Sequence, residues 1–139
     1  MEEKALPAVM ALAYLGDAVY SLYIRRHLVQ MGISHAGELN RLSLAFVTAT
    51  KQAALAKQLL PLLTEAEAGV YRRAFNHRGL SRPSRATLGE YRAATGFEAV
   101  LGALSYMGDE ERLTFLLDTL HAPLFAEEKE NLTKEESKI

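Results

Sequence analysis

The sequence predicts an all-α fold, and three observations carry that prediction. Apolar residues recur at helical spacing along most of the chain, and no segment shows the alternation typical of strands. Gly, Pro, Ser and Thr stand where helices would begin and end. The chain has 139 residues, of which 49% are hydrophobic, enough for a single core. It contains no Cys, which excludes a disulfide scaffold, a zinc finger and a cysteine nucleophile.

The first half of the chain is expected to form two long helical stretches. Pro7 suits the first turn of a helix that runs to about Gln30, and Gly32 provides its stop. Ser34 is expected to cap a second stretch, which keeps apolar residues at helical spacing as far as Leu63.

A short helix, a loop and a longer helix are expected next. Thr64 with Glu67 reads as a capping box that opens a helix through about Phe75. Residues 76–87 contain Gly, Pro, Ser and Arg, a composition typical of a loop. An apolar helix is expected from about residue 89 to residue 107.

The C-terminal part is expected to hold one more helix and a tail. Gly108 suits a helix C-terminus, and Asp109 suits the N-cap of the next helix. That last helix is expected to end near His121, before Pro123. We therefore expect one folded domain over residues 1–125 and a charged, flexible C-terminal tail over residues 126–139.

The net charge of −1 conceals a strong segregation of charge. Residues 72–92 carry +5, whereas residues 109–139 carry −5. Arg side chains match phosphate oxygens, and a Gly- and Pro-containing loop lets the backbone approach a polyanion. The alternative is a solvated loop whose arginines pair with the acidic C-terminal region. The candidate nucleic-acid contacts are Arg72, Arg73, Asn76, His77, Arg78, Arg82 and Arg85.

Two isolated carboxylates stand out. Asp17 is the only charge between Ala8 and Ile24, and Glu98 is the only charge between Thr95 and Tyr106. A carboxylate in an apolar helix is costly unless it is paired or bound to a cation. If the two helices pack together, Asp17 and Glu98 can share a divalent cation such as Mg²⁺, which prefers oxygen ligands. The alternative is that each carboxylate pairs with an Arg or caps a backbone group.

The remaining polar and aromatic residues predict no other chemistry. The sequence patterns of nucleotide-binding loops and of zinc proteases are absent. The His residues have no ligand spacing, so we expect His27, His35 and His121 at the surface and His77 in the basic loop. The tyrosines of the first helix are expected to pack in the core or at an interface.

The N-terminus does not look like a signal peptide, and Asp17 interrupts the one apolar stretch long enough to raise a membrane span. The sequence thus predicts a cytoplasmic protein with no membrane partner.

Two motifs resemble those of a known family. The run from Tyr14 to Tyr20 resembles the signature helix of ribonuclease III domains, and the run from Gly96 to Gly102 resembles their second acidic motif. The run Tyr-Arg-x-x-Thr-Gly-Phe-Glu-Ala, which begins at Tyr91, and a length that leaves no room for a double-stranded-RNA-binding domain resemble the Mini-ribonuclease III family.

This resemblance implies an all-α, dimeric ribonuclease III catalytic-domain bundle with Asp17 and Glu98 as catalytic and metal-binding residues. The cofactor would be Mg²⁺, with Mn²⁺ as a substitute. The substrate would be double-stranded RNA, usually the 23S ribosomal RNA precursor, cleaved to 5′-phosphate and 3′-hydroxyl ends. Partners would be a second copy of the chain and ribosomal proteins that present the RNA. The stretch from Arg72 to Arg85 would enter the RNA groove.

The sequence also departs from full-length ribonucleases III. Met10, Ala13 and Thr95 occupy positions where those enzymes carry further acidic residues, which leaves few protein ligands for a metal. A non-catalytic RNA-binding dimer in ribosome biogenesis is therefore the second hypothesis. Lys51 and Gln52 lie in a run similar to the family's second helix and, with Thr95, are weaker site candidates.

Overall fold

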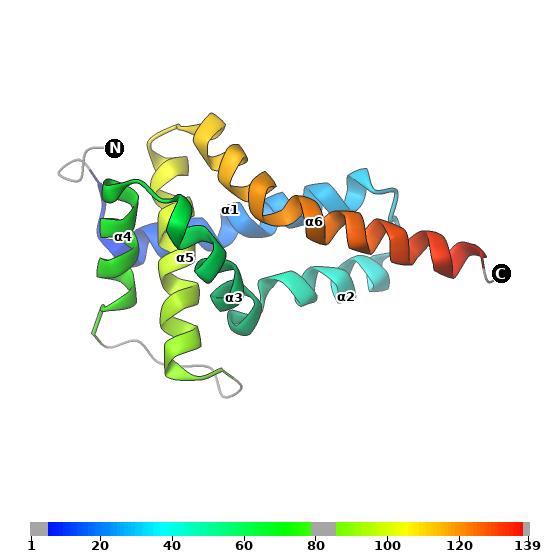
Figure 1. The fold of residues 1–139 in the computed structure, drawn as a ribbon, viewed down its shortest axis with the longest axis horizontal. Coiled ribbons are helices and arrows are strands. Elements are labelled where there is room, and N and C mark those ends of the chain that lie inside the picture. The colour runs from blue at the N-terminus through cyan, green and yellow to red at the C-terminus, as the bar shows by residue number, and fades with distance from the viewer. Residues whose placement is uncertain (1–5, 79–85, 138–139) are drawn as a thin grey trace.

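The computed structural model describes residues 6–78 and 86–137, and within these ranges it is built of helices joined by short turns. This confirms the all-α prediction. The elements, in chain order, are α1 (Val9–Gln30), α2 (Ala36–Val47), α3 (Ala49–Leu59), the 3₁₀ turn η2 (Leu60–Leu62), α4 (Glu65–Phe75), α5 (Leu88–Tyr106) and α6 (Glu110–Ser137), as shown in Figure 1.

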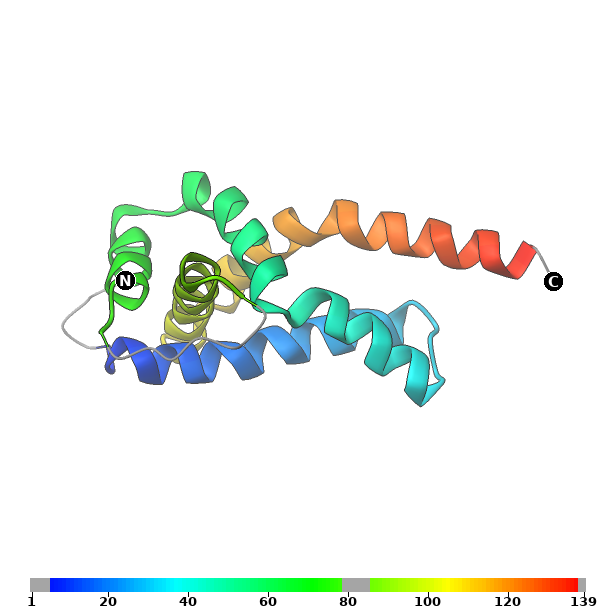
Figure 2. The same cartoon turned by 90° about the horizontal axis from the view of Figure 1, so that it is seen from below.

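Helix α5 is the centre of the fold. Figure 2 shows it almost end-on, with α1, α3 and α4 arranged around it. Its middle is a run of small and apolar residues, and ten of its side chains or glycines are buried. A helix buried on several sides needs such a sequence. Any charge on this helix is therefore held in a defined place by its neighbours.

Helices α1 and α5 cross in very close contact, and two glycines make this contact possible. A Cβ on Gly16 would lie 2.6 Å from the backbone carbonyl carbon of Glu98, and a Cβ on Gly102 would lie 2.7 Å from the carbonyl carbon of Leu12. Real Cβ atoms do not come so near to backbone atoms. The two backbones therefore meet where only glycine fits, beside Asp17 on one helix and at Glu98 on the other.

The second helical stretch is broken, which corrects the expectation of one stretch from Ser34 to Leu63. The chain turns at Thr48, whose backbone is extended and whose hydroxyl accepts the N–H of Lys51 as the N-cap of α3. The cap of α2 is His35 and not Ser34. A threonine within an apolar pattern can thus start a new helix, because its side chain replaces a missing backbone partner.

Two other predicted helix boundaries are confirmed. Thr64 and Glu67 form a reciprocal capping box at the start of α4, which ends at Phe75. Gly108 has a φ of +75°, and the N–H of Asp109 donates to the carbonyl of Leu104. Glycine adopts this left-handed conformation at little cost, so the chain can reverse into α6.

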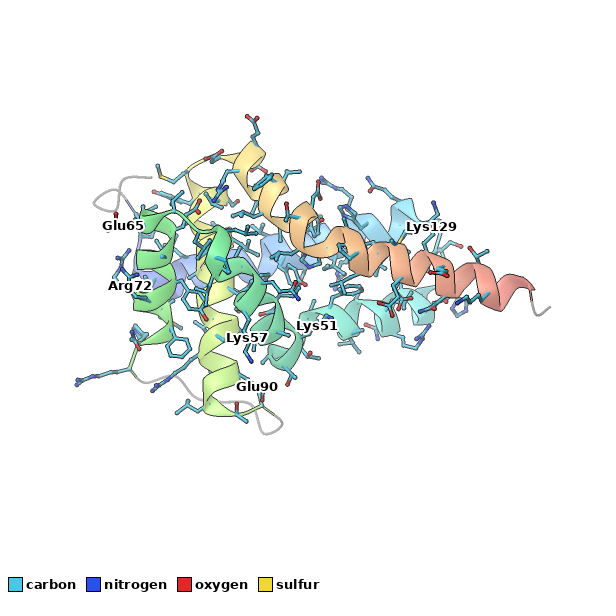
Figure 3. All side chains as sticks on the ribbon, viewed as in Figure 1. Lys51, Lys57, Glu65, Arg72, Glu90 and Lys129 are labelled. Atoms are coloured by element: carbon cyan, nitrogen blue, oxygen red, sulfur yellow. The ribbon has the colours of Figure 1, made fainter. Side chains whose placement is uncertain are left out.

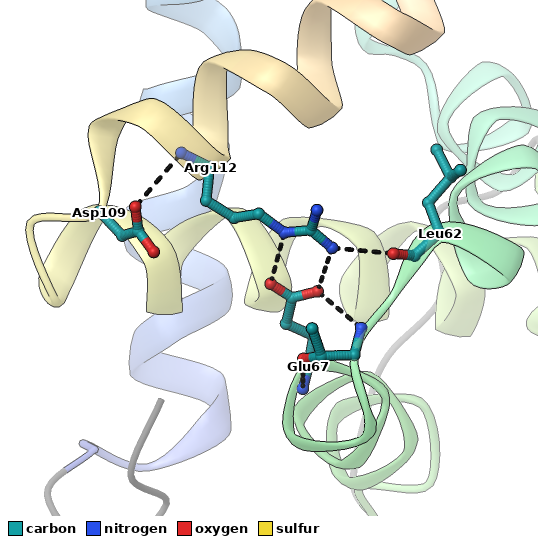
Figure 4. A network of polar contacts seen from close by, with 5 residues as sticks. Leu62, Glu67, Asp109 and Arg112 are labelled. Atoms are coloured by element: carbon teal, nitrogen blue, oxygen red, sulfur yellow. Dashed lines mark hydrogen bonds and ion pairs between the residues drawn. The ribbon is translucent and has the colours of Figure 1, made fainter.

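A partly buried ion pair fixes the start of α6 to α4 (Figure 4). The Arg112 guanidinium donates to both carboxylate oxygens of Glu67, at 2.9 and 3.0 Å, and to the carbonyl of Leu62 at 2.8 Å. These bonds hold the pKa of the Glu67 carboxyl below its usual value despite its burial. The pair joins η2, α4 and α6 into one rigid end of the molecule.

Helix α6 continues to Ser137, so the expectation that it ends near His121 is wrong. Pro123 lies inside the helix and removes one backbone hydrogen bond. Packing after Pro123 compensates for that loss, because Leu124, Phe125 and Leu132 rest against the core. The Phe125 ring stacks on His27, with centroids 4.7 Å apart and planes within 6°. The division of the chain at residues 125 and 126 stays a prediction.

One histidine is buried, contrary to the expectation that it lies at the surface. His121 is fully buried against α1, where its Nδ1 donates to the carbonyl of Leu117 and its Nε2 accepts the Tyr20 hydroxyl at 2.8 Å. We assign this tautomer because a carbonyl can only accept. Burial lowers the pKa of His121 to about 4, so the imidazole is neutral.

The two sides of α1 differ. Leu12, Tyr20 and Ile24 are fully buried, whereas Tyr14 is 84% exposed and Leu22 is 56% exposed. Helix α1 is thus covered on one side only. No helix in the described ranges has the length and apolar character needed to cross a membrane.

Candidate active site

The structure brings Asp17 and Glu98 together. Asp17 lies on α1 directly after Gly16, and Glu98 lies on α5 at the point where Gly16 meets its backbone. The two carboxyl groups are close enough to share a hydrogen bond. Two acidic side chains some 80 positions apart in sequence therefore lie together, with Glu98 half-buried and Asp17 exposed, and their role as a metal site stays a prediction.

The electrostatics of this pair are unfavourable without a cation. Burial raises the pKa of Glu98 to about 9, and the hydrogen bond and negative charge of Asp17 add to that effect. At neutral pH the metal-free site therefore keeps a proton on Glu98, which donates to Asp17. A bound cation would replace that proton, since it neutralises both carboxylates at once.

Gln52 completes the cluster from a third helix. It lies in the first turn of α3, and its side chain is buried, with only 3% of its surface exposed. Its amide Nε2 donates to the carbonyl of Val47 at 3.4 Å, and the side chain lies near enough to Glu98 to favour its ionised carboxylate. Residues from α1, α3 and α5 thus meet at one point.

The two other weak candidates have different surroundings. Thr95 is buried one turn before Glu98, and its hydroxyl donates to the carbonyl of Tyr91 at 2.9 Å. Lys51 is half-buried, and its positive charge contributes to lowering the pKa of His121. Neither residue has a described contact with Asp17 or Glu98.

The donor set fits a hard divalent cation, with most of the ligands supplied from outside the chain. In residues 6–78 and 86–137 no group of three or more His, Asp and Glu side chains could hold a metal ion. Two carboxylates suit Mg²⁺, which commonly retains several waters and binds proteins through one or two carboxylates. Water and a phosphate of the substrate would fill the remaining positions.

The basic residues gather at the end of α4. Arg72, Arg73, Asn76, His77 and Arg78 are all exposed there, and Figure 3 shows Arg72 at the outer edge of α4. Arg82 and Arg85 lie outside the described residues. Exposed guanidinium groups near a helix end can contact phosphates without disturbing the core.

This basic cluster and the carboxylate pair lie on different sides of α5. Tyr71, beside Arg72, packs its ring on Gly96, where an added Cβ would lie 2.6 Å from the ring. Glu98 follows two residues later, which is roughly 160° around the helix. A ligand that touches both groups must therefore be large, as a nucleic-acid duplex is.

Sequence reasoning missed two features of the site. The pairing of Gly16 and Gly102 across α1 and α5 depends on a crossing that periodicity does not predict. The contact of Gln52 with Glu98 depends on the break at Thr48, because that break sets which side of α3 faces α5. The Thr48 cap pattern was the available signal.

Comparison with known proteins identifies the class of protein to which this chain belongs. The ribonuclease III domain matches residues 10–109, a range that includes both carboxylates. The chain therefore belongs to the ribonuclease III family. It is an endoribonuclease of that type, a class that acts on double-stranded RNA and generally uses a divalent metal. The enzyme, and not the non-catalytic binder, is the hypothesis that this membership supports.

Comparison with individual relatives identifies the subgroup of the ribonuclease III family. The chain is 44% identical to Mini-ribonuclease 3 of Symbiobacterium thermophilum, over 78% of this chain and 83% of that protein. It is 41% identical to Mini-ribonuclease 3 of Streptococcus pneumoniae, over 78% and 86%. A crystal structure of a Fusobacterium nucleatum protein superposes with a TM-score of 0.79 at 28% identity, covering 87% of this chain and 93% of that one. The predicted Mini-ribonuclease III membership is thereby confirmed.

Proposed function

We propose that this chain hydrolyses double-stranded RNA with Mg²⁺ held by Asp17 and Glu98, and that Mn²⁺ can substitute. Its substrate in the cytoplasm is the precursor of 23S ribosomal RNA, presented with ribosomal proteins, and the products carry 5′-phosphate and 3′-hydroxyl ends. The observation that carries this proposal is the meeting of the two carboxyl groups from α1 and α5.

The site residues have separate tasks in this mechanism. When bound, the metal supplies charge neutralisation at the scissile phosphate and an activated water at neutral pH. Asp17 and Glu98 hold it, and Glu98 must first release the proton that the metal-free site retains. Thr95 carries no charge, and its hydroxyl donates to the carbonyl of Tyr91 on its own helix, so it adds no ligand charge to this mechanism.

The α4 end supplies affinity for the duplex. Arg72, Arg73, Asn76, His77 and Arg78 would contact phosphate and 2′-hydroxyl groups, together with Arg82 and Arg85. Such contacts are strongly salt-dependent. Replacing Arg72 and Arg78 by Ala should weaken duplex binding and reduce its salt dependence, whereas Lys129→Ala on α6 should leave both unchanged.

The exposed side of α1 supports a homodimer. Tyr14, Leu22 and Val29 are 84%, 56% and 60% exposed, an apolar stripe that a second copy of the same helix can cover. Sedimentation should find a dimer for the natural chain and a monomer for Tyr14→Asp. A dimer of unchanged affinity in that variant would exclude this surface.

The central test uses Asp17→Asn. A labelled RNA duplex in Mg²⁺ should be cleaved by the natural chain and left intact by the variant, because a neutral amide holds the metal poorly. Binding of the duplex in Ca²⁺ should be nearly unchanged. Asp118→Asn is the matched control, since Asp118 lies exposed on α6 and accepts the Tyr23 hydroxyl, which an amide oxygen can also do. Cleavage by Asp17→Asn at the natural rate would overturn the assignment.

A further inference from the structure

Arg92 is a half-buried cation with an unpaired nitrogen. It lies in the second turn of α5, where the protein encloses its Nε. Across residues 6–78 and 86–137, this Nε is the one buried side-chain nitrogen or oxygen that lacks a hydrogen-bond partner. Buried polar groups are almost always hydrogen-bonded, and a guanidinium cannot lose its charge. Arg92 therefore has an unused capacity to bind an anion.

The carboxylates nearest to Arg92 along the chain are engaged on other sides of α5. Glu90 accepts the N–H of Thr87 in the capping box that starts the helix. Glu98 lies about 9 Å further along the helix and roughly 120° around it. The acidic start of α6 follows the opposite end of α5, about 20 Å from Arg92 along the helix (Figure 1). Residues 79–85, outside the described ranges, contain no Asp or Glu.

Arg92 lies on the side of α5 that faces α4 and its basic cluster. Gly96, one turn later and roughly 40° around the helix, packs on the ring of Tyr71 from α4. Phe75, the last residue of α4, lines the same cavity as Gly89 in the first turn of α5. The end of α4 that carries the exposed basic cluster thus lies beside the turns of α5 that carry Arg92.

We propose that Arg92 binds one backbone phosphate of the RNA duplex, at a place between the basic cluster of α4 and the carboxylate pair. This inference rests on the proposed function, because it takes double-stranded RNA as the ligand. A guanidinium presents several N–H donors in one plane, which match phosphate oxygens. Because Nε is enclosed, the phosphate meets the terminal nitrogens at the outer end of the side chain.

The burial of Arg92 gives this contact a task that the exposed arginines do not have. Arg72 and Arg78 are exposed, so their long side chains can follow phosphates over a range of positions. The enclosed Nε holds the guanidinium of Arg92 in one place on the central helix. Arg92 is therefore a positioning residue, which sets where the duplex lies relative to Asp17 and Glu98.

A purely structural role makes a different prediction. If Arg92 served only to fill space with its aliphatic stem, Arg92→Met would keep most of that packing and leave duplex binding unchanged. Arg92→Lys keeps the charge without the planar fork, so it should restore part of the affinity that Arg92→Met loses. Arg41→Met is the matched control, because it removes the same charge from an exposed arginine on α2.

The first experiment measures binding of a labelled RNA duplex in Ca²⁺ over a range of salt concentrations, with urea unfolding of each variant. Arg92→Met should weaken binding about tenfold and reduce the slope of log affinity against log salt by about one, as loss of one phosphate contact does. Its urea midpoint should not fall, since the variant removes an unpaired charge. In Mg²⁺ it should raise KM more than it lowers kcat. Arg41→Met should change none of these quantities.

A second measurement locates the phosphate. One phosphate at a time is replaced by an uncharged methylphosphonate at a 2′-O-methyl nucleotide, and the duplexes are bound to both proteins. One position should weaken binding of the natural chain about tenfold and leave binding of Arg92→Met unchanged, because the two changes remove the same contact. If every position costs the two proteins the same, Arg92 holds no particular phosphate and the proposal is wrong.

The outcomes separate this inference from the proposed function. If Arg92→Met keeps the natural affinity and salt slope while Asp17→Asn loses cleavage, the role of Arg92 is overturned and the proposed function stands. If Arg92→Met lowers the urea midpoint and the affinity with an unchanged salt slope, its role is structural and the phosphate contact is likewise overturned. If the natural chain binds no RNA duplex, the proposed function fails before any variant is compared, and the inference fails with it.

Discussion

Replacing Gly16 by Ala should destabilise the protein and disturb its metal site together. The new methyl would lie 2.6 Å from the carbonyl carbon of Glu98 and 3.0 Å from the amide nitrogen of Gly102, whereas ordinary contact begins at 3.4 Å. The carbonyl oxygen of Glu98 would lie nearer still, so the helices must separate by more than an ångström. Backbone atoms cannot yield as side chains do, so overpacking at the upper end of about 3 kcal/mol applies, offset by about 1 kcal/mol of helix propensity.

The net loss in free energy of unfolding is thus about 2 kcal/mol, measured by urea titration. Gly89→Ala is the control, because the nearest atom to a Cβ there is the Thr87 hydroxyl at 4.0 Å, and it should stabilise by up to about 1 kcal/mol. Gly16→Ala should also weaken Mn²⁺ binding, since the shift acts on the backbone of Glu98. Equal stability of the two variants would refute this account of the crossing.

Three further changes test other parts of the structure. Arg112→Met leaves the Glu67 carboxylate buried without its partner, and urea titration should find a loss of about 3 kcal/mol. Burial lowers the pKa of His121 from 6.5 to about 4, so the unfolded chain binds a proton that the folded chain excludes. The free energy of unfolding should therefore fall by up to about 3 kcal/mol as the pH is lowered from 6.5 to 4. The His121→Gln variant should lack that fall. Because the pKa of Glu98 in the metal-free protein is about 9, Mn²⁺ affinity should rise up to about tenfold from pH 7 to pH 8, and a pH-independent affinity would contradict the shared proton.

The parts of the fold that local chemistry determines could be predicted from the sequence. Thr64 with Glu67 and Gly108 with Asp109 mark helix ends through contacts within a few residues, and the structure places the ends there. The continuation of α6 past Pro123 could not be read in this way. It depends on the packing of Phe125 against His27, two residues nearly a hundred positions apart in sequence.

For the candidate site too, features set by local sequence could be predicted, and features set by long-range contacts could not. The proximity of Asp17 and Glu98 could be predicted because each is the lone charge in an apolar run, although the cost of burying a carboxylate applies to the half-buried Glu98 and not to the exposed Asp17. The burial of His121 could not, since nothing near it in sequence indicates that Tyr20 will supply a partner for its ring. Contacts between helices far apart in sequence, such as that of Gly16 with the backbone of Glu98, become visible only when the helices are placed.

Helix α1 has two proposed roles, in the cation site and in the dimer, and only the second of them needs another copy of the chain. Asp17 lies beside Glu98 of its own chain, so each copy contains both carboxylates of the proposed cation site. Tyr14, one turn earlier, is 84% exposed and makes the surface that a second copy would cover. A monomeric Tyr14→Asp variant should therefore still bind Mn²⁺ with natural affinity.

The duplex has two antiparallel strands, and a single carboxylate pair can reach only one of them at a time. Dimerisation along α1 would bring two complete sites to one duplex, so loss of the dimer should reduce paired cleavage of the two strands while leaving the metal site intact.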